Sequence, residues 1–204
     1  GFANTYHYWQ GPKDDSIANP LNWSDYIYLN AGISYMQEDG PPKAHWCAEI
    51  SQGSALADKN TEFLGLAVSG SLVVKSGVKV HARNELRVAD KGKLILQGGS
   101  VSSLRWLEVQ SGGTLTGHGV VNADLYSHGE LALSVNNPLI VKGTARISGQ
   151  LRLTDVGKVK SGQSFTVLKA TSISGRFANK EVFLKDGRSY SIAYTPTAVT
   201  LTAN

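Results

Sequence analysis

Glycine recurs at positions 77, 92, 112, 129 and 149, between short segments in which apolar and polar residues alternate. The alternation has the period of two that a β-strand with one buried face requires. Glycine reaches positive φ without a Cβ clash, so we expect these five positions to be tight turns with positive φ. A repeat of roughly 15–20 residues with one strand-turn-strand unit is typical of a solenoid.

The repeated units also resemble one another in register. Leu-x-Val precedes the glycine and Leu or Ile follows it, as in 85–96 and 107–115. Equivalent residues of successive coils stack in a β-solenoid, so this register predicts an inward ladder of Leu and Val. A β-sandwich with turns every ~8–12 residues is the main alternative, and it has no need of such self-similarity. We therefore predict an all-β, single-stranded parallel β-solenoid (β-helix) of five or six coils.

Composition divides this single domain, 1–204, into three zones. Residues 1–62 hold three of the four Trp and five of the eight Tyr. An open solenoid end exposes apolar core and unpaired strand edges and has to be covered. We expect an aromatic N-terminal cap over 1–62, solenoid coils over 63–155 and a C-terminal β cap over 156–204.

Charge and cysteine content exclude several classes of protein. Charged residues make up 18% of the chain, below the roughly 25% of typical soluble domains, and there are no long helical stretches of the kind that form bundles. The single cysteine, Cys47, excludes an intrachain disulfide scaffold. Residues 1–118 carry ten Lys/Arg against eleven Asp/Glu, and residues 119–204 carry ten against five. The basic residues are scattered, so we expect no nucleic-acid binding. No apolar run approaches the ~18 residues that a membrane span needs, so we expect no membrane insertion either.

Two stretches resemble a known class of bacterial protein. The sequence Leu-Glu-Val-Gln-Ser-Gly-Gly-Thr-Leu-Thr-Gly-His-Gly at 107–119 resembles the coils of autotransporter passenger domains and related surface-protein solenoids of Gram-negative bacteria. Tyr8-Trp9-x-Gly11 followed by Asn19-Pro-Leu-Asn22-Trp23 is similar to the W-x-G … P-x-N-W motif that precedes such solenoids. The resemblance implies a right-handed coil and a secreted or cell-surface location. It implies little about activity, because such coils are scaffolds for many functions.

Signals for catalysis are weak. Glycoside hydrolysis needs two carboxylates facing one groove, and none of the candidate acids lies in a recognisable motif. The five histidines lack metal-ligand spacing, so we expect no metal site. No cofactor is expected either; acids from adjacent coils could hold calcium, but no calcium motif is present. The candidate acids are Asp14, Asp15, Asp25, Glu38, Asp39, Glu85 and Asp90.

Aromatic and polar residues crowd the first 46 positions, as in proteins that stack sugar rings on flat side chains. The same residues suit a solenoid cap, which is the favoured role for Trp9 and Trp23 and remains open for Trp46. The alternation near Trp106 does not show which face of its strand the side chain occupies, because Leu107 is also expected to point inward. If Trp106 points outward, it would suit a sugar-binding strip. The candidate ligand-binding residues are Trp9, Trp23, Asp25, Tyr26, Tyr28, Asp39, His45, Trp46, Arg105 and Trp106.

The leading expectation is a non-catalytic polysaccharide-binding module, covalently linked to catalytic or anchoring domains of a larger secreted or surface protein. The excess positive charge after residue 118 permits an anionic polysaccharide without requiring one. The first alternative is a structural or adhesive spacer without a ligand. The second is a small polysaccharide lyase or hydrolase.

Overall fold

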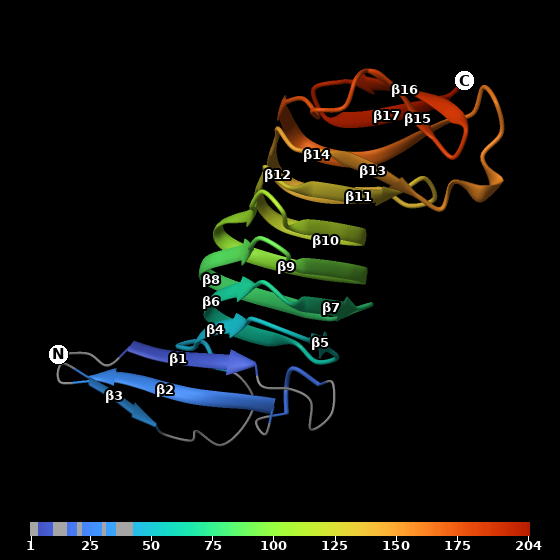
Figure 1. Cartoon of the computed structure of the whole chain (residues 1–204). Coiled ribbons are helices and arrows are strands. Elements are labelled where there is room, and N and C mark those ends of the chain that lie inside the picture. The colour runs from blue at the N-terminus through green and yellow to red at the C-terminus, as the bar shows by residue number, and fades with distance from the viewer. Residues whose placement is uncertain (1–3, 10–15, 20–21, 30–31, 36–42) are drawn as a thin grey trace.

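The computed structural model describes residues 4–9, 16–19, 22–29, 32–35 and 43–204. These residues form an all-β parallel solenoid of about five turns, stacked between a sheet at the N-terminal end and another at the C-terminal end (Figure 1). The solenoid prediction is therefore confirmed over the β-sandwich. The strands are β1 (Asn4–Trp9), β2 (Trp23–Leu29), β3 (Gly32–Tyr35), β4 (Cys47–Ile50), β5 (Ser54–Ala57), β6 (Thr61–Val68), β7 (Ser71–Lys75), β8 (Lys79–Val88), β9 (Lys93–Val109), β10 (Thr114–Ser127), β11 (Glu130–Ser134), β12 (Leu139–Ile147), β13 (Leu151–Thr154), β14 (Ser164–Gly175), β15 (Val182–Lys185), β16 (Arg188–Tyr194) and β17 (Ala198–Ala203), with a 3₁₀ turn η2 (Val156–Lys158).

Each complete turn of the solenoid has three sides. The long strand β9 runs along all three, because it pairs with β7 through its first residues and with both halves of β8 through the rest. Successive turns lie parallel and in register, so like residues stack and the expected Leu ladder forms inside. One such column consists of Leu72, Leu94, Leu115, Leu131 and Leu151, all buried.

The corner glycines are present for two different reasons. Gly77 and Gly112 have φ of 76° and 84°, as predicted. The same prediction is wrong for Gly92, Gly129 and Gly149, whose φ is not positive. These three are needed because successive corners stack almost in contact. A Cβ on Gly149 would lie 1.8 Å from the carbonyl oxygen of Gly129 on the preceding turn.

An aromatic sheet caps the N-terminal end of the solenoid, and the coils begin before residue 63, since β4 and β5 already pair in parallel with β6 and β7. Strand β1 pairs antiparallel with β2 and parallel with β4, and this joins the cap sheet to the first coil. Trp9, Trp23 and Trp46 are 2%, 6% and 0% exposed. The ring of Trp23 lies 5.4 Å from Trp9 and 6.0 Å from Trp46, edge to face in both contacts. Its Nε1–H donates to the carbonyl oxygen of Ile17 at 2.9 Å, which satisfies the buried polar group.

The C-terminal end is closed by antiparallel strands. β17 pairs with β14 on one side and β16 on the other, and β15 completes a hairpin with β16. Tyr194 anchors this cap to the preceding loop, because its hydroxyl accepts a hydrogen bond from the Phe177 N–H at 2.9 Å. The Arg176 guanidinium lies 4.7 Å from the centre of the same ring. Burial raises the pKa of Tyr194 above its ordinary value.

Candidate functional site

An exposed tryptophan lies on the side of the solenoid formed by β4 and the last parts of β6, β8, β9, β10 and β12. Trp106 is 41% exposed, whereas the next residue, Leu107, is fully buried. The strand therefore turns Trp106 outward, which resolves the parity that the sequence left ambiguous. Leu104, at the bend just before it, is 72% exposed. The partner strand β10 has a register shift between Asn122 and Asp124 at the same level.

Two rows of outward side chains cross the strands on this side, with one residue of each row per strand. We call the two rows together the Trp106 face. The first row is Tyr8, Glu49, Ala67, Arg87, Glu108, Tyr126 and Arg146, and the second is Cys47, Gly65, Glu85, Trp106 and Asp124.

Trp106 packs against Tyr126 of the next turn, and residues of the turn after that fix Tyr126 and Asp124. Its ring lies 5.7 Å from that of Tyr126 at an interplanar angle of 69°, an edge-to-face contact. The Arg146 guanidinium lies 4.9 Å from the centre of the Tyr126 ring and 3.9 Å from the Asp124 carboxylate. Asp124 also accepts a hydrogen bond from the Thr144 N–H at 2.8 Å. The aromatic pair is therefore fixed before any ligand arrives, which lowers the entropy cost of binding.

A shallow groove of about 330 Å³ adjoins Trp106, with Arg105 and Glu108 among its lining residues. Its other wall contains Glu85 and Arg87, which form an ion pair at 2.9 Å. The groove thus offers an aromatic ring together with carboxylate acceptors and guanidinium donors. This combination suits a ligand that has both apolar C–H faces and hydroxyl groups.

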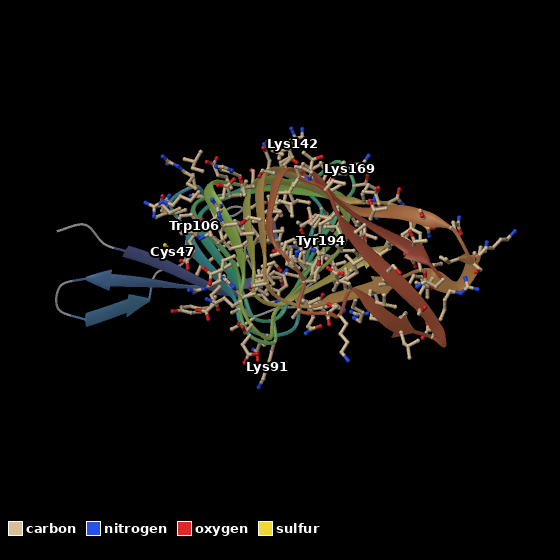
Figure 2. The ribbon with its side chains drawn as sticks, turned by 90° about the horizontal axis from the view of Figure 1, so that it is seen from above. Cys47, Lys91, Trp106, Lys142, Lys169 and Tyr194 are labelled. Atoms are coloured by element: carbon tan, nitrogen blue, oxygen red, sulfur yellow. The ribbon has the colours of Figure 1, made fainter. Side chains whose placement is uncertain are left out.

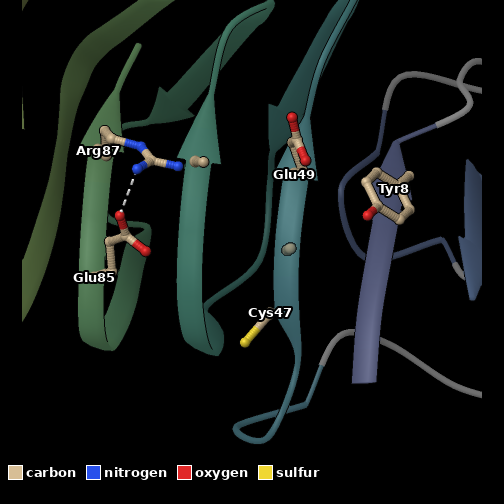
Figure 3. Close-up of a pocket in the computed structure, with 7 residues that line it drawn as sticks. Tyr8, Cys47, Glu49, Glu85 and Arg87 are labelled. Carbon is tan, nitrogen blue, oxygen red and sulfur yellow. Dashed lines mark ion pairs between the residues drawn. The ribbon is translucent and has the colours of Figure 1, made fainter. Parts of the chain in front are cut away.

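A second, smaller hollow of about 100 Å³ lies further along the same face. Figure 3 shows Tyr8 at one side of it, the Glu85–Arg87 pair at the other, and Glu49 and Cys47 between them. Burial raises the pKa of the Cys47 thiol, and the negative charge of Glu85 raises it further. The thiol is therefore uncharged at neutral pH and lies in the negative field of a carboxylate.

The structure separates the sequence-predicted site residues. Trp9, Trp23 and Trp46 are buried in the cap, so the expectation that they present rings to a ligand is wrong. Trp46 stacks on His7 with ring centroids 3.4 Å apart and an interplanar angle of 7°. The cap alternative accounts for all three because the first coil needs large apolar side chains to cover its open end. His45 is exposed just before β4.

The side chains of four further candidates lie outside the described part of the structure. Asp25, Tyr26 and Tyr28 belong to β2, in the cap sheet, and the positions of their side chains lie outside the described part of the structure. Asp39 lies entirely outside the described residues.

Of the predicted residues, the structure brings Arg105 and Trp106 together. Sequence reasoning missed Tyr126, which contacts Trp106, as well as Arg146, which contacts Tyr126, and Arg87. The available signal was register, because alignment of Leu107 with Leu125 and Ala145 places Tyr126 and Arg146 at the position of Glu108, on the same side as Trp106.

Another hollow, of about 390 Å³, lies along the stacked corners that contain Gly112, Gly129 and Gly149. Its side chains include His128, whose Nδ1 is hydrogen-bonded to the Ser148 hydroxyl at 3.0 Å. No aromatic ring of Trp, Tyr or Phe lines it. It is therefore less suited to a sugar than the groove beside Trp106.

In the described part of the chain, no group of three or more His, Cys, Asp or Glu side chains is placed to hold a metal ion. Nor does any helix among the described residues have the length and apolar character needed to cross a membrane. Comparisons of the chain with protein-family models, with curated proteins and with solved structures gave no match.

Proposed function

We propose that the chain is a non-catalytic polysaccharide-binding module and that the Trp106 face is its binding site. The observation that carries this proposal is an exposed Trp106 fixed against Tyr126, beside charged side chains that can bond hydroxyl groups. Trp offers a large contact area at low conformational cost.

The shape of the site favours a polymer over a small molecule. The groove beside Trp106 is half open to solvent and lies on a regular sheet, with neighbouring strands on both sides of it. A polymer can pass over such a surface and continue beyond it, whereas a small ligand binds best in a cavity that encloses it. Attached to a larger secreted or surface protein, the module would raise the concentration of its neighbouring domains near the polymer.

Trp106→Ala should weaken polysaccharide binding about 30-fold, the effect of removing a central aromatic residue worth ~2 kcal/mol. We suggest affinity electrophoresis through gels that contain glycogen, xyloglucan, galactomannan, hydroxyethyl cellulose, pectate or alginate. Leu184→Ala is the matched control, because Leu184 is 77% exposed in the C-terminal cap. This control should migrate like the wild type on every gel.

The remaining outcomes separate the alternatives. If none of these polymers slows the wild-type chain, the spacer function is supported and the binding module is not. If the chain instead releases reducing ends or unsaturated products from a polymer, it is an enzyme. If Trp106→Ala and the wild type are slowed equally, the polysaccharide binds elsewhere on the molecule.

A further inference from the structure

We infer that the site is a track along the solenoid axis, from Tyr126 and Trp106 past Arg87 to Tyr8, and that it takes an extended segment of an uncharged polysaccharide. This inference rests on the proposed function and adds the course and the charge class of the ligand.

The two hollows on the Trp106 face share a wall. Glu85 and Arg87 line both the groove beside Trp106 and the smaller hollow beside Tyr8. Beyond this pair, Ala67 and Gly65 are the outward residues of the two rows on β6. Neither has a large side chain, so the Glu85–Arg87 pair is the feature that separates the two hollows, and a polymer would pass over this pair from one hollow to the other.

The length of the path fits several sugar rings. From β10, which carries Tyr126, the path crosses β9, β8, β6 and β4 before it reaches β1. Five steps between neighbouring strands at ~4.8 Å give roughly 24 Å. Aromatic side chains lie at both ends, with Trp106 and Tyr126 at one and Tyr8 at the other.

Arg87 provides a specific polar contact in the middle of the track. Its Nη1 is engaged by Glu85 at 2.9 Å, which fixes the guanidinium. Its Nε is buried and has no hydrogen-bond partner among the described residues. A buried donor without an acceptor costs about 1–3 kcal/mol. Because this Nε is enclosed by protein, a sugar contacts Arg87 through the outer N–H groups of the guanidinium, since the side chain is 38% exposed and can donate to a hydroxyl above it.

The charges along the track favour a polymer without negative groups. Arg87 and Arg146 each already face a carboxylate, Glu85 and Asp124 respectively. Glu49 and Glu85 both line the smaller hollow, where a uronic acid or a sulfate would meet like charge. Figure 2 shows Cys47 and Trp106 on one flank of the solenoid, away from Lys142 and Lys169. Of the basic residues of the second half, Arg146 lies on this face but is paired with Asp124, whereas Lys142 and Lys169 lie away from Glu49 and Glu85.

Ala67→Trp tests the course of the track. Ala67 is half-buried on the outer side of its strand, so the larger side chain should be tolerated by the fold while it fills the smaller hollow. Binding of long oligosaccharides of the retained polymer should fall at least tenfold in isothermal titration calorimetry. Binding of di- and trisaccharides beside Trp106 should not change. Ile140→Trp, on another side of the solenoid, is the control and should bind both as the wild type does.

Each result of this series decides one claim. If Ala67→Trp binds long chains as tightly as the wild type, the track is overturned while the Trp106 site stands. If Trp106→Ala also binds like the wild type, the Trp106 face is not the binding site, and if the wild type binds no polymer, the proposed function itself fails.

Charge is tested by a second, independent comparison that does not depend on the folding of Ala67→Trp. The retained polymer is compared with a derivative whose primary hydroxyls have been oxidised to carboxylates. At low salt the derivative should bind at least tenfold more weakly, and Glu49→Gln should narrow this difference. If the oxidised derivative binds the wild type as tightly as its parent, or only pectate and alginate are retained, the uncharged class is overturned.

Discussion

Trp46→Ala should destabilise the protein by about 3–5 kcal/mol, the usual cost of truncating a large, fully buried aromatic side chain. Trp46 is 0% exposed, and its ring contacts both His7 and Trp23. Its carbonyl oxygen also accepts hydrogen bonds from the N–H groups of Leu64 and Gly65, at 2.8 and 3.3 Å. Removal of the ring leaves a cavity where the cap meets the first coil.

The change is measured by thermal unfolding followed by circular dichroism. For a chain of this length, 3–5 kcal/mol corresponds to a melting temperature lowered on the order of 10 °C. Trp106→Ala is the matched control, since its outward side chain leaves no internal cavity, and it should shift the melting temperature by a few degrees at most. Equal shifts for the two variants would contradict the assignment of Trp46 to the cap and of Trp106 to the surface.

Gly149→Ala should cost about 3 kcal/mol although it adds one methyl group. The new Cβ would lie 1.8 Å from the Gly129 carbonyl oxygen and 2.7 Å from that of His128. Both are backbone atoms of the preceding turn, so they cannot rotate away as a flexible side chain would. The two turns must separate at this corner, which also strains the hydrogen bond from the Ala178 N–H to the Gly149 carbonyl oxygen, 2.8 Å long.

Gly157→Ala is the control for this prediction. Nothing lies within 4 Å of a Cβ built on Gly157, and its φ is not positive. Its free energy of unfolding in urea should stay within about 0.5 kcal/mol of the wild-type value. If Gly149→Ala is as stable as Gly157→Ala, close stacking of the corners is not what requires glycine at position 149.

The fold could be predicted because each turn of a solenoid repeats the same pattern of inward and outward residues in the sequence. Leu94, Leu115 and Leu131 occupy one column, so their shared register is visible as a repeat. The structural reason for each corner glycine could not be predicted from the sequence. Gly112 and Gly149 look alike in the sequence, yet one provides positive φ and the other provides space. That difference depends on the approach of a neighbouring turn, which no local pattern encodes.

The candidate site could be predicted only in part. The many aromatic residues of the first 46 positions led to the prediction of ligand-binding residues in the cap. Trp46 and Trp23 are buried there, because they cover the open end of the core. Trp106 was identified, but its strand parity could not be assigned because the chain bends at Leu104. Tyr126 and Arg146 occupy the register position of Glu108 on the next two turns, and alignment of the coils on Leu107 and Leu125 would have placed them on the same side as Trp106.

Quenching of tryptophan fluorescence by acrylamide tests the proposed site most directly. Trp106 is 41% exposed, whereas Trp9, Trp23 and Trp46 are at most 6% exposed, so the accessible emission comes mainly from Trp106. Addition of the polysaccharide retained in affinity electrophoresis should protect this emission from acrylamide. Trp106→Phe should show little quenching either with or without the polymer. Protection of Trp106 is the result that we expect; a polymer that binds the wild type and leaves its quenching unchanged would contradict binding on the Trp106 face.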